Sequence, residues 1–249
     1  MDVHSLYTTY TDYVKSIVQF NDLTNFKNNP AYTYMLEHVN ESLGHQYLQL
    51  IKDKFGMSDI DILVFANMND AIGNPKKFSY LGTQISPSSL RYIFQAMLIL
   101  AHFQSQGVSS IRIVEIGGGY GGLCLAVNYC LKFFPEISVS QYNIIDLEAP
   151  TKLQAKYLSH HRLSFPVCTH LAETFGSNIQ GGDDLYLISN YCFSEIDAGL
   201  QTRYVSSLFP KINHGFITWN NIPLYDIGKT VTFEEEYPKT GPMNLYVRF

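Results

Sequence analysis

The stretch Ile111-Arg-Ile-Val-Glu-Ile-Gly-Gly-Gly-Tyr-Gly-Gly122 decides the fold of this 249-residue chain. Its β-branched first half predicts a strand over 111–116, and the residues that follow predict a helix over 121–134. Five glycines fall in the six positions from 117 to 122. Because glycine lets the backbone turn tightly and approach a ligand closely, a strand, a glycine loop and a helix in this order are typical of a nucleotide site.

The sequence after this stretch alternates between strand and helix patterns. Further strands are predicted at 141–146, 165–171, 184–189 and 215–219, helices at 151–160 and 198–209, and two last strands at 230–233 and 244–249. This alternation predicts an α/β domain over 107–249, with a mostly parallel Rossmann-like sheet and helices on both faces. Ligands of such sheets bind at the carboxyl ends of the strands, near the point where the strand order reverses.

The sequence before the glycine stretch is mainly helical in pattern. Apolar residues recur at helical spacing over 6–20, 31–55, 58–66 and 88–104, while 67–77 reads as a polar loop. Ser86-Pro87 fits a helix N-cap followed by proline at the first helical position. We therefore expect residues 1–106 to form a helical N-terminal cap that contributes to the substrate region.

Composition excludes several classes of protein. The net charge is −5, and Lys and Arg form no stripe, so a surface that tracks nucleic-acid phosphates is not expected. No apolar run reaches membrane-spanning length, and the first residues lack a basic start followed by an apolar stretch, so a cytoplasmic protein is expected. The four cysteines, isolated from one another in the sequence, are expected to be free thiols: Cys124, Cys130, Cys168 and Cys192.

Two nucleotide cofactors compete for the loop. Gly117, Gly119 and Gly122 satisfy the dinucleotide pattern G-x-G-x-x-G, and Asp146 ends the next strand where an acid meets ribose hydroxyls. A pyrophosphate, however, favours bare backbone N–H groups with no anion nearby, and Glu115 precedes the loop by two residues. S-adenosylmethionine (SAM) has no phosphate and carries cationic sulfonium and ammonium groups, so the Glu115 carboxylate favours SAM.

Four segments carry a family resemblance. Residues 114–122 resemble the first motif of class I SAM-dependent methyltransferases. Residues 85–92, 145–154 and 188–195 resemble one branch of them, the sugar O-methyltransferase family, so the resemblance covers roughly 80–221. It implies a Rossmann-like SAM methyltransferase sheet with an antiparallel last strand. It also implies O-methylation of a sugar hydroxyl, in a nucleotide sugar or in glycan biosynthesis.

The resemblance also implies a set of cofactor contacts. The methionine part of SAM is expected against the loop, the ribose on Asp146, the adenine near Leu147, and the sulfonium and acceptor beside Asn190 and Tyr191. The residues expected to line the methionine part are Glu115, Gly117, Gly119, Tyr120 and Gly121.

Transfer of a methyl group to a hydroxyl calls for a general base, because a neutral sugar hydroxyl is a poor nucleophile. Glu195, which follows a strand on the ligand side, is the first candidate, although Glu195 and Asp197 also suit the N-terminus of the next helix. His170, at the end of the third strand, is the alternative base. The expected substrate contacts are polar or aromatic side chains: Gln84, Ser86, Arg91, Tyr92 and Asn220.

Other interpretations stay open at this point. Glu195, Asp197, Asn220 and Asn221 offer oxygen ligands for a divalent metal, but no tight acidic triplet exists, and no metal ligand is assigned. An NAD(P)-dependent sugar dehydrogenase or epimerase is the alternative enzyme, and an inactive methyltransferase-fold scaffold subunit is the alternative without activity. A sugar, nucleotide sugar or glycan is the expected partner, without nucleic acid or membrane, and a homo-oligomer is compatible with the sequence.

Overall fold

A computed structural model describes residues 3–220 and 222–249 of the chain. The chain forms two compact units whose segments interleave along the sequence. Unit 1 contains residues 1–98, 119–130 and 152–162, and unit 2 contains residues 99–118, 131–151 and 163–249. Within the described ranges, no helix combines the length and apolar character needed to cross a membrane.

Unit 1 is mostly helical, as expected of the N-terminal region. The helix or mixed segment expected over 58–66 is a helix, and it extends to Asp70, into the stretch predicted as a loop. It begins at a polar cap, since the Ser58 hydroxyl accepts from Asp61 N at 3.1 Å. The elements of unit 1 are α1 (Val3–Phe20), η1 (Phe26–Asn28), α2 (Pro30–Thr33), α3 (Glu41–Phe55), α4 (Asp59–Asp70), β1 (Phe78–Tyr80), β2 (Thr83–Ile85), the first part of α5 (Pro87–Ser105), α6 (Gly122–Cys130) and most of α7 (Glu148–Leu158).

The prediction of one continuous helix over 31–55 is wrong. The helix stops after Thr33 and resumes at Glu41, because Asn40 adopts extended backbone and its side chain accepts from Leu43 N at 2.9 Å. This side-chain bond gives the chain an alternative to helix at Asn40 and starts α3 there. The intervening segment is left outside any helix, with its polar side chains available for other contacts.

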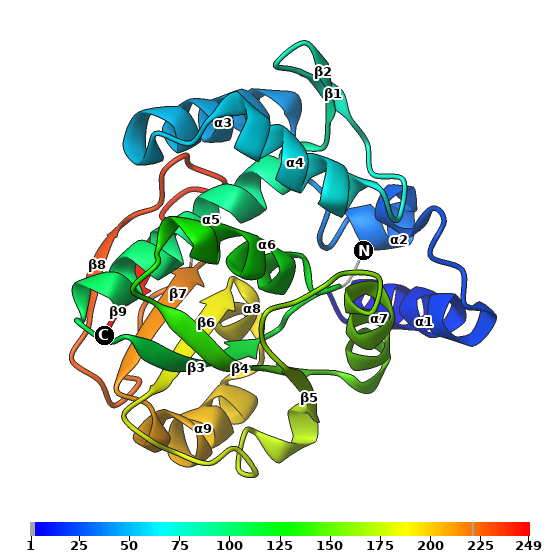
Figure 1. Cartoon of the computed structure of the whole chain (residues 1–249). Coiled ribbons are helices and arrows are strands. Elements are labelled where there is room, and N and C mark those ends of the chain that lie inside the picture. Colours follow the sequence, from blue (N-terminus) through cyan, green and yellow to red (C-terminus); the bar gives the residue numbers. More distant parts are fainter. Residues whose placement is uncertain (1–2, 221) are drawn as a thin grey trace. The chain divides into compact units, whose positions relative to one another are not determined.

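A short hairpin joins α4 to α5 and was not expected from the sequence. Strands β1 and β2 pair antiparallel, with Tyr80 opposite Thr83, and both are visible in cyan in Figure 1. The two turn residues, Leu81 and Gly82, both have positive φ values, 53° and 73°. Two positive φ values in a two-residue loop match the twist of hairpin strands.

Unit 2 is built on a seven-stranded sheet in the order β5-β4-β3-β6-β7-β9-β8. The strands are β3 (Ser110–Ile116), β4 (Ser138–Asp146), β5 (Val167–Leu171), β6 (Leu185–Asn190), β7 (His214–Trp219), β8 (Thr232–Glu235) and β9 (Leu245–Arg248). The first five are parallel, and β9 runs antiparallel to both of its neighbours. The antiparallel last strand that the resemblance implied is therefore present.

Within unit 2, helices pack on both faces of the sheet. On one face, Leu185 and Leu187 of β6 join a buried cluster with Phe193 of α8 (Cys192–Glu195) and Tyr204 of α9 (Ala198–Ser207). On the other face, the Phe103 ring of α5 lies 4.5 Å from the Tyr186 ring. The Rossmann-like α/β class is thus confirmed. The remaining short turns are η2 (Leu131–Phe133), η3 (Ala172–Thr174) and η4 (Phe209–Lys211).

The strand order places a switch point beside β3. From β3 the chain continues to β4 on one side, and it later returns to β6 on the other side. Arg112 and Asp184 fix this junction at the opposite end of the strands, because the guanidinium donates to both carboxylate oxygens at 2.7 Å. The carboxyl ends of β3, β4 and β6 consequently meet at one edge, where sheets of this kind bind ligands.

Candidate functional site

Gly117 opens the loop at the carboxyl end of β3 and admits only glycine. Its φ is +77°, a conformation that residues with a Cβ seldom adopt. A Cβ built there would lie 2.2 Å from the Sγ of Cys192. The Gly117 N–H donates to Ile145 O at 2.9 Å, so the turn is tied to β4 and packed directly against the start of α8.

Glu115 is a buried acid two residues before this turn, with only 2% of its surface exposed. The Tyr142 hydroxyl of the neighbouring strand donates to its Oε2 at 2.9 Å. Burial raises the pKa of Glu115 to about 8, and the nearby Asp146 carboxylate adds to the rise, while the Tyr142 bond opposes it. A buried carboxyl of this kind gains by the arrival of a cation, which would favour its ionised form.

Asp146 and Leu147 end β4 beside the same edge. The Leu147 N–H donates to Asp146 Oδ1 at 2.8 Å, which orients the carboxylate at the strand end. Leu147 is 38% exposed, and Leu171, opposite Asp146 at the end of β5, is 45% exposed. Two apolar side chains exposed beside an oriented carboxylate form a surface suited to a flat heterocycle with an attached diol.

Asn190 and Tyr191 form a strained turn after β6. Tyr191 has φ 64° and ψ −36°, an uncommon backbone conformation for a non-glycine residue and one that is often found at functional sites. The turn is held from both sides: the Tyr191 N–H donates to Thr218 O at 2.8 Å, and the Tyr191 hydroxyl donates to Glu236 Oε1. Asn190 Oδ1 accepts from the Thr218 hydroxyl at 2.8 Å.

Glu195 and Asn220 meet across the ends of α8 and β7. The Asn220 side-chain amide donates to Glu195 Oε1, and Glu195 is exposed. The other amide atom, Asn220 Oδ1, is buried and accepts from no residue that the structure describes. Asp197, in contrast, caps α9 by accepting from Gly199 N at 2.8 Å. The helix-capping role considered for both acids thus falls to Asp197. Asn221, a metal-ligand candidate, lies outside the described residues.

His170 is held by two side-chain amides. Its Nε2 lies 3.0 Å from Asn143 Oδ1, and its Nδ1 lies 3.1 Å from the Asn178 amide nitrogen. These contacts fit a neutral ring that donates through Nε2 and accepts at Nδ1, and burial lowers the pKa of His170. With both ring nitrogens occupied, the geometry favours a structural role for His170 over that of a base.

The second half of the glycine loop belongs to unit 1, where Tyr120 enters a buried aromatic cluster. The Tyr120 hydroxyl donates to Asn69 Oδ1 at 3.0 Å, and the Tyr157 hydroxyl donates to the same atom at 2.7 Å. Lys27 is fully buried and donates to Asn69 O at 2.7 Å. Burial lowers the pKa of Lys27 to about 8. On either side of Tyr120, Gly119 and Gly121 have φ values of 56° and 97°.

Four of the five expected substrate residues belong to unit 1 and lie in different environments, whereas the fifth, Asn220, follows β7 in unit 2. Gln84 is exposed on the hairpin, whereas Ser86, Arg91 and Tyr92 are buried. Ser86 N donates to Asp70 Oδ2 at 2.7 Å, Arg91 donates to Leu36 O at 3.1 Å, and the Tyr92 ring packs edge-on against Tyr120 at 5.8 Å. Ser86 also lines a pocket of unit 1.

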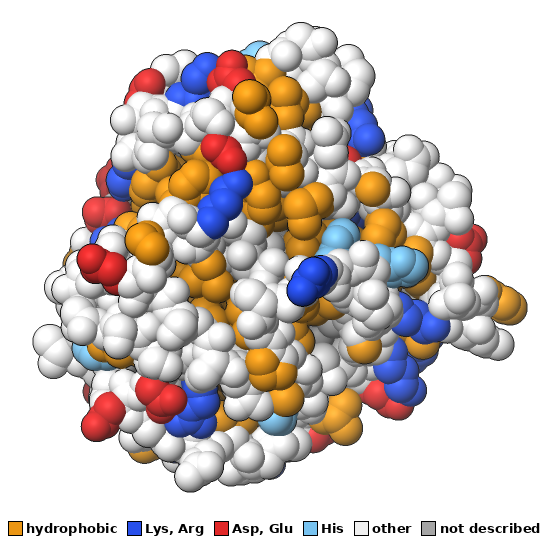
Figure 2. All heavy atoms as spheres, viewed as in Figure 1, with side chains coloured by type: hydrophobic (Ala, Val, Ile, Leu, Met, Phe, Trp, Pro, Cys, Tyr) orange, Lys and Arg blue, Asp and Glu red, His pale blue; other side chains and the backbone are white. Residues whose placement is uncertain are grey.

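Several residues at these sites were not singled out from the sequence. Lys27 and Asn69 hold Tyr120, Cys192 seats Gly117, and Tyr142 holds Glu115. A lysine in a polar stretch reads as a surface residue, and nothing local signals its burial. The described ranges hold no group of three or more His, Cys, Asp or Glu side chains able to bind a metal. On the face shown in Figure 2, Lys and Arg stand singly or in small groups among acidic residues.

No protein-family model matches this sequence, and no curated protein matches it. Solved structures do match. A candidate SAM-dependent methyltransferase from Methanococcus maripaludis is 16% identical over 51% of this chain and 55% of its own, with a TM-score of 0.36. PKMT2 from Rickettsia typhi, solved with AdoHcy, is 18% identical over 45% of this chain and 22% of its own, with a TM-score of 0.34.

A third match extends over nearly the whole chain. The mitomycin 7-O-methyltransferase MmcR is 12% identical over 98% of this chain and 67% of its own, with a TM-score of 0.45. The chain therefore spans about half or less of the first two matched proteins and two thirds of the third.

Proposed function

We propose that this protein is a SAM-dependent O-methyltransferase whose acceptor is the hydroxyl of a sugar, free, nucleotide-linked or within a glycan. The observation that carries the proposal is Glu115, a buried acid beside the glycine turn, with a pKa raised to about 8. A cationic ammonium would be paired by this carboxyl, whereas a pyrophosphate at the same loop would find no cation among the residues described around Glu115.

The residues at the sheet edge fit the cofactor. Glu115 and the Gly117 turn would hold the methionine part, Asp146 the ribose hydroxyls, and Leu147 the adenine. Asn190 and Tyr191, fixed in their strained turn, would border the transferring group. SAM, when bound, supplies a methyl group activated by the positive charge of a sulfonium.

The remaining chemistry falls to this chain's own side chains. Glu195 would accept the proton of the acceptor hydroxyl, and Asn220 would orient both partners, because its amide donates to Glu195 while its buried Oδ1 stays available to a hydroxyl donor. A positioned base of this kind contributes about 10²–10⁴-fold to a rate. The sugar assignment is supported by the resemblance of residues 85–92 and 188–195 to sugar O-methyltransferases.

Calorimetry with SAM, AdoHcy and NAD tests the cofactor. We expect SAM and AdoHcy to bind and NAD not to bind. We also expect proton release on SAM binding, seen as a dependence of the heat on the ionisation enthalpy of the buffer, because the cation ionises Glu115. Binding of NAD instead would support a dehydrogenase, and binding of no cofactor would support a scaffold. Labelled SAM with a panel of nucleotide sugars and glycans, read by mass spectrometry, tests the acceptor and the expected cytoplasmic sugar chemistry.

A further inference from the structure

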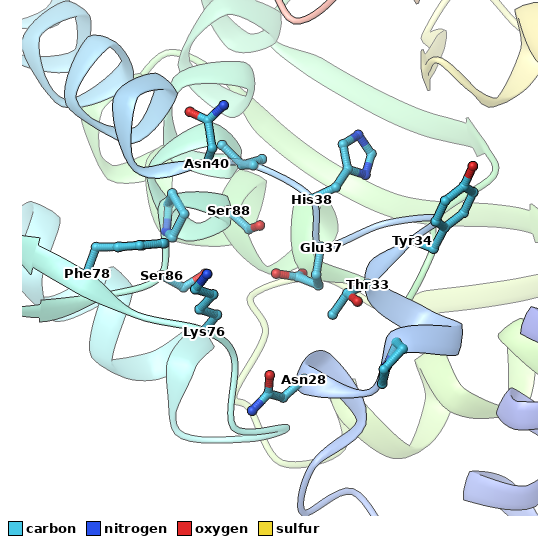
Figure 3. A pocket seen from close by; sticks show the side chains of 13 residues that line it. Asn28, Thr33, Tyr34, Glu37, His38, Asn40, Lys76, Phe78, Ser86 and Ser88 are labelled. Atoms are coloured by element: carbon cyan, nitrogen blue, oxygen red, sulfur yellow. The ribbon is translucent and has the colours of Figure 1, made fainter.

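Unit 1 contains a pocket of about 420 Å³ that lies where the predicted long helix is interrupted. Its wall includes Thr33, Glu37 and Asn40 from the interrupted segment and Ser86 and Ser88 from the start of α5. Small-molecule pockets usually measure about 300–1,000 Å³, so the volume suits a single small ring. Figure 3 shows these side chains arranged around Glu37.

Glu37 is the chemical centre of the pocket. Its Oε1 is buried and has no hydrogen-bond partner among the described residues. Burial raises the pKa of Glu37, and the nearby Asp70 carboxylate adds to the rise, while the charges of Lys27 and Arg91 and a hydrogen bond from Ser88 lower it. A buried oxygen that makes no hydrogen bond costs about 1–3 kcal/mol, so a ligand that donates to it removes a penalty already present in the fold.

The charges around Glu37 select the kind of donor. Two cations, Lys27 and Arg91, already act on its carboxyl, and Lys76 lines the pocket as well. A cationic ligand would meet these three positive side chains, whereas a neutral hydroxyl donor would not. The other polar lining groups are amides, hydroxyls and the His38 imidazole, which both donate and accept. Two aromatic side chains, Phe78 and Tyr34, lie on opposite sides of Glu37 in Figure 3 and offer apolar surface for the C–H face of a ring.

We infer that this pocket binds a neutral, polyhydroxylated ring through hydroxyl donation to Glu37. Naming a sugar as the occupant rests on the proposed function, in which a sugar is the acceptor. Occupancy of the pocket is nevertheless measurable without methyl transfer, and SAM binding is measurable without the pocket, so failure of either proposal can be told apart from failure of the other.

Saturation-transfer NMR and calorimetry with three probes test the inference: the methyl pyranosides of glucose, mannose and galactose. We expect at least one of them to bind the full chain. The permethylated form of that glycoside, which lacks hydroxyl donors, and cyclohexylamine, which is cationic, should not bind. Glu37→Leu should weaken glycoside binding by about 10–100-fold, the range for a hydrogen bond to a charged group.

The control is Glu41→Leu, which removes an exposed carboxylate at the start of α3, outside the pocket lining. It should bind the glycoside as the wild type does. Glu37→Leu also removes the acceptor of the Ser88 bond and the anion that faces Lys27 and Arg91, so its melting temperature should fall, and an unchanged SAM affinity checks that it folds. The comparison of the glycoside with its permethylated form on the wild type tests hydroxyl donation independently of this variant. Equal glycoside binding by Glu37→Leu and wild type, binding of cyclohexylamine alone, or binding of none of the three glycosides would overturn the inference.

Discussion

The ammonium nitrogen of Lys27 lies 4.1 Å from the centroid of the Tyr120 ring. It lies 4.8 Å from the Tyr157 ring as well, and the hydroxyls of both tyrosines donate to Asn69. A buried cation between two rings is worth about 2 kcal/mol or more when desolvated. This contact anchors the one residue of the glycine loop that has a side chain.

Lys27→Met should therefore destabilise the protein and loosen the loop. The loss combines the cation–π contacts with the bond to Asn69 O, so we expect a decrease in the free energy of unfolding of about 2–3 kcal/mol. SAM affinity should fall with it. Urea denaturation and calorimetry measure the two effects. Lys15→Met, which changes a lysine 63% exposed in α1, is the control and should stay within about 0.5 kcal/mol of wild type.

Gly117→Ala should be severely destabilising, because the new Cβ meets Cys192 Sγ at 2.2 Å and the backbone keeps φ +77°. Gly107→Ala separates these two causes. Gly107 has φ +72°, but nothing lies within 4 Å of its Cβ position, so only the backbone penalty of about 1–2 kcal/mol applies. In thermal unfolding, the melting temperature of Gly117→Ala should be well below that of Gly107→Ala. Adding Cys192→Gly, which removes both the Sγ and the Cβ that lie 2.2 and 2.3 Å from the new Cβ, should recover part of the difference. Equal melting temperatures of the two glycine variants would show that steric packing against Cys192 does not matter.

Glu115→Gln should change how stability depends on pH. The folded-state pKa of Glu115 is raised from 4.5 to about 8, so between these values the folded protein holds a proton that the unfolded chain has lost. By linkage, wild-type stability falls as pH rises from about 4.5 to 8 and levels off above it. Glu115→Gln lacks this contribution. Its stability relative to wild type should rise between pH 5 and pH 8, measured as urea midpoints, even though its SAM affinity is lower.

The matched control for this titration is Glu136→Gln, at an exposed position in the turn before β4. As a substitution at an exposed surface position, it should stay within about 0.5 kcal/mol of wild type at neutral pH. A Glu115→Gln profile parallel to that of the wild type would show that Glu115 is already ionised at neutral pH.

Glu195→Gln should keep SAM affinity and lose turnover, by about 10²–10⁴-fold if Glu195 is the base. Asp197→Asn is the comparison, because Asp197 caps α9 through Gly199 N. Since asparagine caps helices about as well as aspartate, that variant should keep both stability and turnover. Single-turnover rates with the identified acceptor decide between the two roles, and an unchanged rate in Glu195→Gln would remove Glu195 from the chemistry.

The sequence predicted the parts of the fold whose signals are local. The β-branched run before Gly117 and the later alternation of strands and helices were sufficient for the parallel sheet, and Ser58 marked the start of α4. The prediction of one continuous helix over 31–55 was wrong, because the side chain of Asn40 caps a new helix and outweighs the helical periodicity. The hairpin was not predicted, because Leu81 adopts a left-handed conformation that the sequence does not signal.

The residues of the candidate site were predictable to a similar extent, where local patterns signal them. Glu115, Gly117 and Asp146 follow from the strand–loop pattern, and the structure places them at one sheet edge with Asn190 and Glu195. The burial of Lys27 and of the Glu37 Oε1 was not predictable, because it depends on tertiary packing with residues distant in sequence. The residue type alone does not distinguish a buried charged side chain from an exposed one.

The place of β9 in the sheet sets the order in which the fold can be completed. Strand β8 precedes β9 in the chain, yet among the described strands it pairs only with β9, which also pairs with β7. Residues 232–235 therefore lack their strand partner until Leu245–Arg248 have docked on β7. Exposed strands that lack a partner are prone to pair with other chains. A variant truncated after residue 243 should thus aggregate more readily than the full chain.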